Sequence, residues 1–247
     1  MALNSRLRFL FDSVGQLFLP ADCVVCRKSI SGIDNGLCPD CWQQMLYVSA
    51  NNYCRRCGRD VSKYGILEGA CPACMDSEIC FDAIARAGVY GSILRRTILA
   101  FKNESEELKE KLSPLINAAL AGSGFADDID FYVPVPLHWS RRLTRGYNQA
   151  SLLLKTLEPG SGKISTDLVR VKKTRPQPQM VSDSKRAKNV AGAFAVREGH
   201  NFTGKRVCLV DDIKTSGATL NECAKVLKQA GALKVYALVA AVAGQNQ

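Results

Sequence analysis

The sequence predicts an α/β protein with a mostly parallel sheet and helices on both faces, preceded by a small cysteine-rich, zinc-binding module. Two observations carry this prediction. Eight cysteines lie in CxxC pairs within the first third of the chain, and after residue 80 short apolar, β-rich runs alternate with helical segments. We therefore expect a zinc module with an N-terminal helix over residues 1–80 and an α/β domain over residues 81–247.

Composition and charge narrow the class of protein. The 247 residues are 47% hydrophobic and 23% charged, which suits a globular protein. The formal net charge of +10 points to an anionic partner. No apolar run approaches the roughly 18–20 residues that a membrane-spanning helix needs, so we expect no integral membrane segment.

The first twenty residues are expected to form an amphipathic helix. Apolar residues recur at helical spacing between Leu7 and Phe18. Arg6 and Arg8 give a faint likeness to a signal peptide, but Asp12 interrupts the apolar stretch and no small-residue cleavage site follows. We expect this helix to dock on its own protein, and the protein to be cytoplasmic.

The CxxC pairs predict metal binding. Successive pairs are separated by 11, 12 and 13 residues. Two CxxC turns supply the four thiolates that a tetrahedral zinc site uses, so eight cysteines suit two structural zinc ions. The expected ligands are Cys23, Cys26, Cys38, Cys41, Cys54, Cys57, Cys71 and Cys74.

Three other interpretations of the cysteines, and the pairing itself, stay open. A disulfide scaffold requires an oxidising compartment, a redox-active CxxC is rarely repeated four times, and an iron–sulfur cluster is a smaller rival. Sequential pairing of the CxxC turns and interleaved pairing both fit. Cys208 and Cys223 fall outside the pattern and are expected to be buried apolar residues.

Strands and helices alternate through the rest of the chain. We expect strands at 83–90, 131–137, 205–212 and 234–243, and helices at 93–102, 108–122, 148–157 and 215–231. In a parallel sheet built this way, ligands bind beyond the carboxyl ends of the strands.

The segment from Val207 to Thr219 is the most informative part of the chain. An apolar strand leads into Asp211 and Asp212, and a turn rich in hydroxyl groups then opens a helix. The amides of a helix N-terminus attract an anion, and Gly217 permits close backbone approach. Carboxylates would repel the phosphate itself, so we expect them to face a neutral group, and the two hydroxyls of a ribose fit. The pattern therefore predicts a ribose 5-phosphate site.

This segment resembles the signature of type I phosphoribosyltransferases, which bind 5-phosphoribosyl 1-diphosphate (PRPP) with Mg²⁺. The resemblance implies that Asp211 and Asp212 contact the ribose hydroxyls. It implies a 5-phosphate loop formed by Thr215, Ser216, Gly217, Ala218 and Thr219. Lys214 departs from the aromatic or aliphatic residue expected there, and is either a cation near the phosphate or a solvated lysine.

A narrower resemblance covers almost the whole chain. RGYNQ at 145–149, TRPQ at 174–177 and the RxxNxxGAF stretch at 186–194, together with the cysteines, are similar to the ComF/GntX family. The resemblance implies a type I phosphoribosyltransferase-like fold, a role in DNA uptake and natural transformation, contact with imported single-stranded DNA, and a ComF-type helicase or another competence protein as partner.

A loop of arginines precedes the helix at 148–157. Arg141, Arg142 and Arg145 offer several donors to the diphosphate of PRPP. By resemblance, Arg145, Gly146, Tyr147, Asn148 and Gln149 border the ligand pocket, while Asn148 is also suited to cap the helix.

Residues 170–190 are predicted to form a mobile, basic loop that closes over the site. Lys172, Lys173 and Arg175 are candidates to meet the diphosphate. Residues 138–190 hold 12 Lys and Arg against 3 Asp and Glu, a net charge of +9, more than PRPP requires. A nucleic-acid strand would use such a face. The candidate DNA-binding residues are Arg141, Arg142, Lys185, Arg186 and Lys188.

Three functions remain open. As an enzyme, the protein would displace diphosphate from the anomeric carbon of PRPP, with Asp211, Asp212 and Arg145 as catalytic candidates, an unknown acceptor and no evident general base. The alternatives are a non-catalytic single-stranded DNA-binding module of the uptake machinery and a PRPP-sensing regulator.

Overall fold

The computed structural model covers the 247-residue chain. The residues that it describes are 21–30, 37–49, 52–62, 64–66, 69–75, 77–103, 108–137, 147–157, 162–174 and 182–244. Several predicted features lie outside these residues: the N-terminal helix, Arg141, Arg142, Arg145, Gly146 and Arg175.

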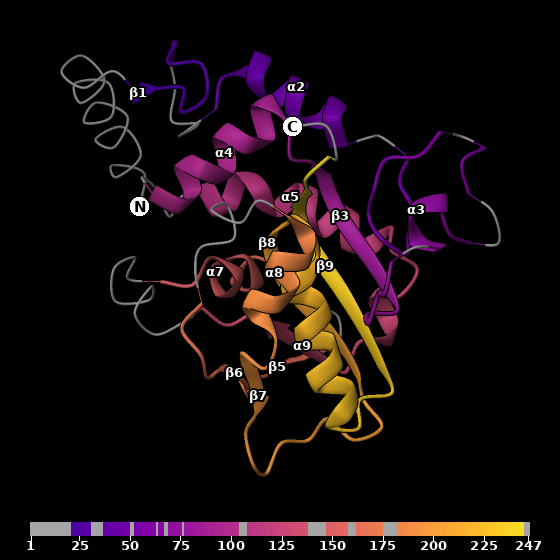
Figure 1. The fold of residues 1–247 in the computed structure, drawn as a ribbon. Helices are drawn as coiled ribbons and strands as arrows, with labels where there is room; N and C mark the ends of the chain where they lie inside the picture. Colours follow the sequence, from indigo (N-terminus) through magenta and orange to yellow (C-terminus); the bar gives the residue numbers. More distant parts are fainter. Residues whose placement is uncertain are drawn as a thin grey trace, which may run out of the picture.

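A five-stranded parallel sheet forms the centre of the molecule (Figure 1). The strand order is β3-β9-β8-β4-β5, and every neighbouring pair runs parallel. The strands span β3 Ala83–Val89, β4 Phe131–Pro134, β5 Lys163–Ile164, β8 Arg206–Lys214 and β9 Lys234–Val242. The predicted mostly parallel sheet is therefore confirmed.

Helices cover both faces of the sheet. Along β8, Val207 and Leu209 point into one core and Cys208 and Val210 into the other, as the alternation of side chains in a strand requires. Helix α9 (Ala218–Gln229) packs on the first face. The second is covered by α4 (Ser92–Asn103), α5 (Leu108–Ala121), α7 (Gln149–Lys155) and part of α2 (Pro39–Ser49).

The segment predicted to be a basic loop contains a helix. Residues Asp183–Val190 form α8, which lies with α9 on the near side of the sheet in Figure 1. Ser182 caps α8, because its hydroxyl accepts a hydrogen bond from the amide of Lys185, and Val190 is buried in the core. The prediction of a loop over 170–190 is thus wrong for the last third of that range.

Smaller elements complete the fold. Strands β6 (Leu168–Arg170) and β7 (Phe194–Val196) form an antiparallel pair beside α9. The cysteine-rich part contains β1 (Ala21–Asp22), β2 (Ser29–Ile30) and the short helix α3 (Pro72–Met75), and η1 (Ala126–Asp128) precedes β4. Within the described part of the chain, no helix has the length and apolar character needed to cross a bilayer.

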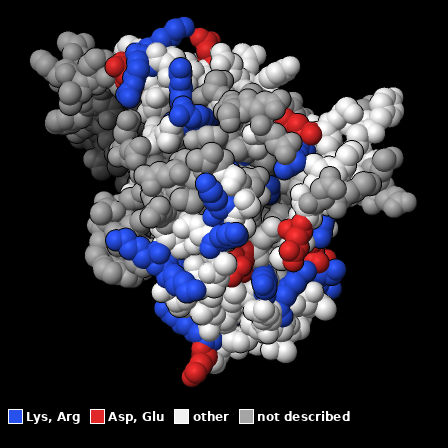
Figure 2. Space-filling view, in the orientation of Figure 1, with Lys and Arg blue, Asp and Glu red and all other residues white. Residues whose placement is uncertain are grey.

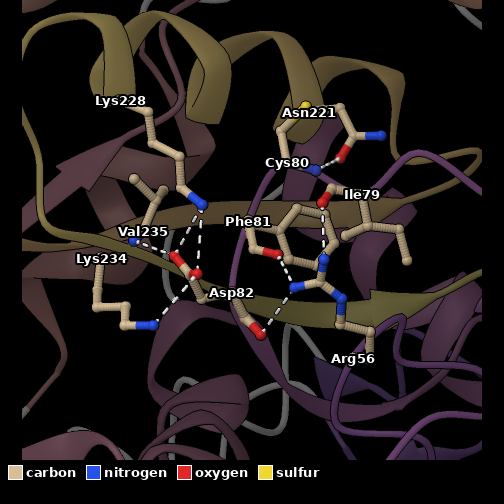
Figure 3. Close-up of polar contacts among 9 residues, drawn as sticks. All are labelled: Arg56, Ile79, Cys80, Phe81, Asp82, Asn221, Lys228, Lys234 and Val235. Atoms are coloured by element: carbon tan, nitrogen blue, oxygen red, sulfur yellow. Dashed lines mark hydrogen bonds and ion pairs between the residues drawn. The ribbon is translucent and has the colours of Figure 1, made fainter.

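A network of polar contacts attaches the cysteine-rich part to the sheet (Figure 3). The Arg56 guanidinium donates to the carbonyl oxygens of Ile79, Phe81 and Asp82 at 2.9, 2.7 and 3.2 Å. The Asp82 carboxylate accepts from the amide of Val235 at 2.8 Å. The segment at 79–82, which follows the second cysteine cluster, is therefore hydrogen-bonded both to Arg56 within that cluster and to β9 of the sheet.

Candidate functional site

The eight CxxC cysteines form two separate clusters of four. Cys23, Cys26, Cys38 and Cys41 make the first, and Cys54, Cys57, Cys71 and Cys74 the second; the sulfurs of each cluster lie within 4.8 Å of one another. The structure thus resolves the open question of pairing: the first CxxC turn joins the second, and the third joins the fourth.

The spacing of the sulfurs suits zinc. Four thiolates at a Zn–S distance of about 2.3 Å in a tetrahedron lie roughly 3.8 Å apart. The distances between sulfurs are 3.6 Å for Cys26–Cys38 and 3.5 Å for Cys57–Cys71. A disulfide would bring the sulfurs to about 2.05 Å, and all eleven cysteines are free, so the disulfide scaffold is excluded.

In each cluster, backbone amides lower the pKa of one cysteine thiol. Burial alone would raise the pKa of Cys23, but the amides of Cys26, Cys38 and Val25 outweigh it and lower the pKa to about 6. The amides of Cys57, Arg56 and Cys71 likewise outweigh burial and lower the pKa of Cys54 to about 7. Burial raises the pKa of Cys41 and Cys57, which a bound cation would reverse.

The two clusters are built on the same turn. The amide of Cys23 donates to the carbonyl of Lys28 at 2.8 Å, and the amide of Cys54 donates to the carbonyl of Arg59 at 2.9 Å. The left-handed position of this turn is Arg27 in the first cluster, with φ 61°, and Gly58 in the second, with φ 81°. Lys28 and Arg59 are therefore equivalent positions of two repeats.

The predicted sugar-phosphate segment lies at the carboxyl end of β8. Asp211 and Asp212 are half-buried near that end. The amide of Asp212 donates to the Asp211 carboxylate at 2.9 Å. Cys223 of α9 is fully buried, which raises its pKa, and the nearby Asp211 charge raises it further, so Asp211 lies close to α9. The prediction that Cys208 and Cys223 are buried is confirmed.

The turn after β8 combines Gly217 with a buried lysine. Gly217 has φ 87° and is the N-cap of α9, so it gives the helix no capping side chain. Lys214 is only 6% exposed, and its Cε lies 2.9 Å from the place that a Cβ on Gly217 would take. Lys214 therefore packs against the turn, and the alternative of a solvated loop lysine is wrong.

A cavity of about 390 Å³ opens beside this turn, within the size range of small-ligand pockets. Lys214, Ser216, Gly217 and Ala218 form one side of it. Other parts of its wall come from the second cysteine cluster and from α8: Cys57, Arg59, Ala73, Ser77, Glu78, Ile79, Ser184 and Ala187. The cavity therefore lies where the second cluster meets the turn, with α8 beside it.

The start of α7 contains two of the predicted pocket residues. Asn148 caps the helix by accepting from the amide of Ala150 at 3.1 Å, as predicted, and donates to the carbonyl of Val135 at 3.1 Å. Gln149 is 3% exposed, and its side-chain nitrogen has no hydrogen-bond partner in the described structure. Tyr147 is half-buried against the core.

The basic residues of the predicted DNA-binding face are exposed. Lys172 and Lys173 follow β6, and Lys185 and Lys188 lie on α8, whereas Arg186 is half-buried. Figure 2 shows Lys and Arg side chains over α8 and around β6. Of these cations, Lys185 and Lys188 lie on α8, which forms one wall of the cavity.

Sequence reasoning missed several residues that line the cavity, among them Arg59, Glu78, Ser184 and Asn221. Arg59 and Glu78 belong to the cysteine-rich third of the chain, far in sequence from the turn. No local pattern indicates that these segments meet, because their contact depends on how the second cluster packs on the sheet.

Two protein-family models match separate parts of the chain. The model for the double zinc ribbon domain matches residues 14–75, and the model for the phosphoribosyl transferase domain matches residues 143–247. The two clusters are therefore zinc ribbons that suit two structural zinc ions, and the strands and helices form a phosphoribosyltransferase-like fold.

Three curated relatives are similar over most of the chain. The chain is 32% identical to competence protein F of Haemophilus influenzae over 85% of its length and 91% of that protein. It is 28% identical to the DNA utilization protein YhgH of Salmonella typhimurium, over 89% of its length and 96% of that protein. It is 24% identical to competence protein ComFC of Bacillus subtilis, over 80% of both chains.

Proposed function

Since the chain belongs to the family of competence proteins F and ComFC, we propose that it binds PRPP with Mg²⁺ at the turn after β8 and acts in the handling of imported DNA. The relatives' names, which refer to competence and DNA utilization, support the second part. One observation carries the first: an acidic pair at the end of a parallel strand runs directly into a glycine turn that opens a helix.

The chemistry of this arrangement matches the ligand. The N-terminus of α9 attracts a phosphate, and the Gly217 turn lets the backbone approach it closely. Asp211 and Asp212 supply acceptors for the two ribose hydroxyls. Mg²⁺ keeps several waters and bonds to diphosphate oxygens, so it needs no cage of protein carboxylates.

As an enzyme, the protein would catalyse a displacement at the anomeric carbon. The bond between C1 and the diphosphate oxygen breaks, diphosphate leaves, and a nucleophile of unknown identity bonds to C1. Positioning of the sugar by Asp211, Asp212 and the turn at 215–219 would supply most of the catalysis, with Arg145 as a further cation.

Calorimetry with PRPP and Mg²⁺ on the zinc-loaded protein tests this proposal. We expect saturable binding that Asp211→Asn and Asp212→Asn each weaken by roughly tenfold or more, because each removes a charged acceptor. Ser113→Ala, on α5, is the control. Unchanged binding in both Asp variants would overturn the assignment. Slow PRPP consumption without an acceptor would favour an enzyme over a PRPP sensor.

A second candidate function rests on the exposed lysines. Lys172, Lys173, Lys185 and Lys188 are exposed and form no ion pair with another described residue, so they would suit a nucleic-acid backbone. Fluorescence anisotropy with short single-stranded oligonucleotides tests this function. We expect affinity to fall steeply with salt and to fall again when these four lysines become alanine, while PRPP binding persists.

A further inference from the structure

We propose that the second zinc ribbon is part of the ligand pocket and that Arg59 binds a phosphate group there, opposite Lys214 and the Gly217 turn. This inference deepens the proposed function, since it concerns the ligand of the same turn. It assigns to the ribbon a role in recognition in addition to its structural role.

The cavity supplies the first argument. It is shared between two parts of the chain that are more than 150 residues apart in sequence, with Arg59 on the ribbon side and Lys214 and Gly217 on the other. Its lining holds two cations, Arg59 and Lys214, and one carboxylate, Glu78. Such a lining suits a phosphate group, because the two cations supply several hydrogen-bond donors to its oxygens.

The side chain of Arg59 supplies the second argument, because its donors are uncommitted. Among the described residues it forms no ion pair and no side-chain hydrogen bond, and it is half-buried. Its ribbon neighbours differ: Arg55 donates to the carbonyl of Gly122 at 2.6 Å, and Arg56 donates to three carbonyls. The equivalent residue of the first ribbon, Lys28, pairs with Asp40 at 3.6 Å.

The backbone of Arg59 is held in place independently of any ligand. The adjacent Asp60 forms an ion pair with Arg86 of β3, whose side chain is 2% exposed. The carbonyl of Arg59 accepts from the amide of Cys54 within the ribbon turn. The fixed backbone keeps Arg59 at the wall of the cavity, so phosphate binding would restrict only the rotamers of its side chain.

Binding of three probes to matched variants tests the inference: PRPP with Mg²⁺, ribose 5-phosphate and inorganic phosphate. We expect Arg59→Ala to weaken the binding of all three by roughly 10- to 100-fold, the effect of losing a charged hydrogen bond to phosphate. Arg59→Lys should recover part of the loss. Lys28→Ala, which removes a cation at the equivalent position of the first ribbon, should bind as the wild type does.

The outcomes separate the two proposals. Wild-type binding that Arg59→Ala leaves unchanged overturns the role of Arg59 and spares the proposed function. Loss of phosphate and ribose 5-phosphate binding in Arg59→Ala, with no PRPP binding by the wild type, upholds the phosphate site and overturns the proposed function. A wild type that binds none of the three probes overturns both.

Hydrogen exchange of the wild-type protein gives a second test that needs no variant. Ligand should slow exchange of the amides at 57–61 in the second ribbon as well as those at 216–220. Protection confined to 216–220 would contradict the inference, even if the Arg59 variants failed to fold.

Discussion

Asn221, in the first turns of α9, holds Cys80 in place just beyond the second zinc ribbon. Its side-chain oxygen accepts from the amide of Cys80 at 3.1 Å (Figure 3). Its side-chain nitrogen donates to the carbonyl of Glu78 at 2.8 Å. The helix that follows the glycine turn is thus tied directly to the ribbon. Through this one side chain the zinc module and the proposed phosphate site share a support.

Replacing Asn221 should loosen that support. We expect Asn221→Ala to reduce the free energy of unfolding by about 1–3 kcal/mol, because two backbone groups lose their partner. It should also weaken PRPP binding. Urea denaturation and calorimetry measure the two effects. Gln229→Ala, at the exposed end of the same helix, is the control. An Asn221 variant as stable as the control would contradict the prediction.

The zinc content should respond to each ribbon separately. The wild-type chain is expected to carry two zinc ions, and the double change Cys71→Ser and Cys74→Ser should leave one, because those cysteines belong to a single cluster. Atomic emission spectroscopy on purified protein measures this. Cys80→Ser, outside both clusters, should retain two. Loss of both ions from the double variant would mean that the sites are not independent.

The turn glycine of the second ribbon should resist substitution. Gly58 has φ 81°, and a Cβ there would lie 3.0 Å from Cγ2 of Val242 in the sheet. Gly58→Ala should therefore cost about 2–3 kcal/mol, from strain and from the close contact.

A second glycine allows the cost of backbone strain to be measured without the cost of the close contact. Gly199 has φ 76° but nothing within 4 Å of its Cβ position, so Gly199→Ala should cost only about 1 kcal/mol. Thermal unfolding of the two variants makes the comparison. Equal losses would show that the contact with the sheet adds nothing.

Asp82 should make part of the stability depend on pH. Burial opposes ionisation of its carboxyl, but the amide of Val235 and the ammonium groups of Lys228 and Lys234 outweigh burial and lower the pKa below its ordinary value of 3.8. The folded protein therefore holds this carboxylate ionised to lower pH than the unfolded chain does. Its stabilisation is complete above that ordinary value and is lost as the pH falls through the folded-state pKa.

The variant Asp82→Asn removes this contribution. We expect it to be less stable than the wild type by about 1–2 kcal/mol at pH 7. The difference should stay constant down to about pH 5 and shrink below about pH 4. Urea denaturation across this range measures it. A difference that grew on acidification would contradict the assigned direction.

The sequence alone predicted the central strands well because their apolar runs are long and their flanking turns are clear. The run at 205–212 became β8, which begins one residue later and extends to Lys214, and the run at 234–243 became β9. The helix α8 was missed because its residues are highly charged and its stabilising contact, the buried Val190, is a single residue near its end.

The candidate site was only partly predictable. Asp211 lies within β8 and Gly217 is the N-cap of α9, so a local pattern located both residues. Lys214 was ambiguous, because its burial depends on how it packs against Gly217. Arg59 gave no signal at all, because only the packing of the ribbon on the sheet brings it to the cavity.

A crystal structure of the zinc-loaded protein with PRPP and Mg²⁺ tests the central claim most directly. The account predicts electron density for the 5-phosphate against the backbone amides at Ser216–Thr219, with the ribose hydroxyls at Asp211 and Asp212. The account would be contradicted by a ligand bound elsewhere, or by a fully ligand-saturated crystal in which those two carboxylates contact only protein.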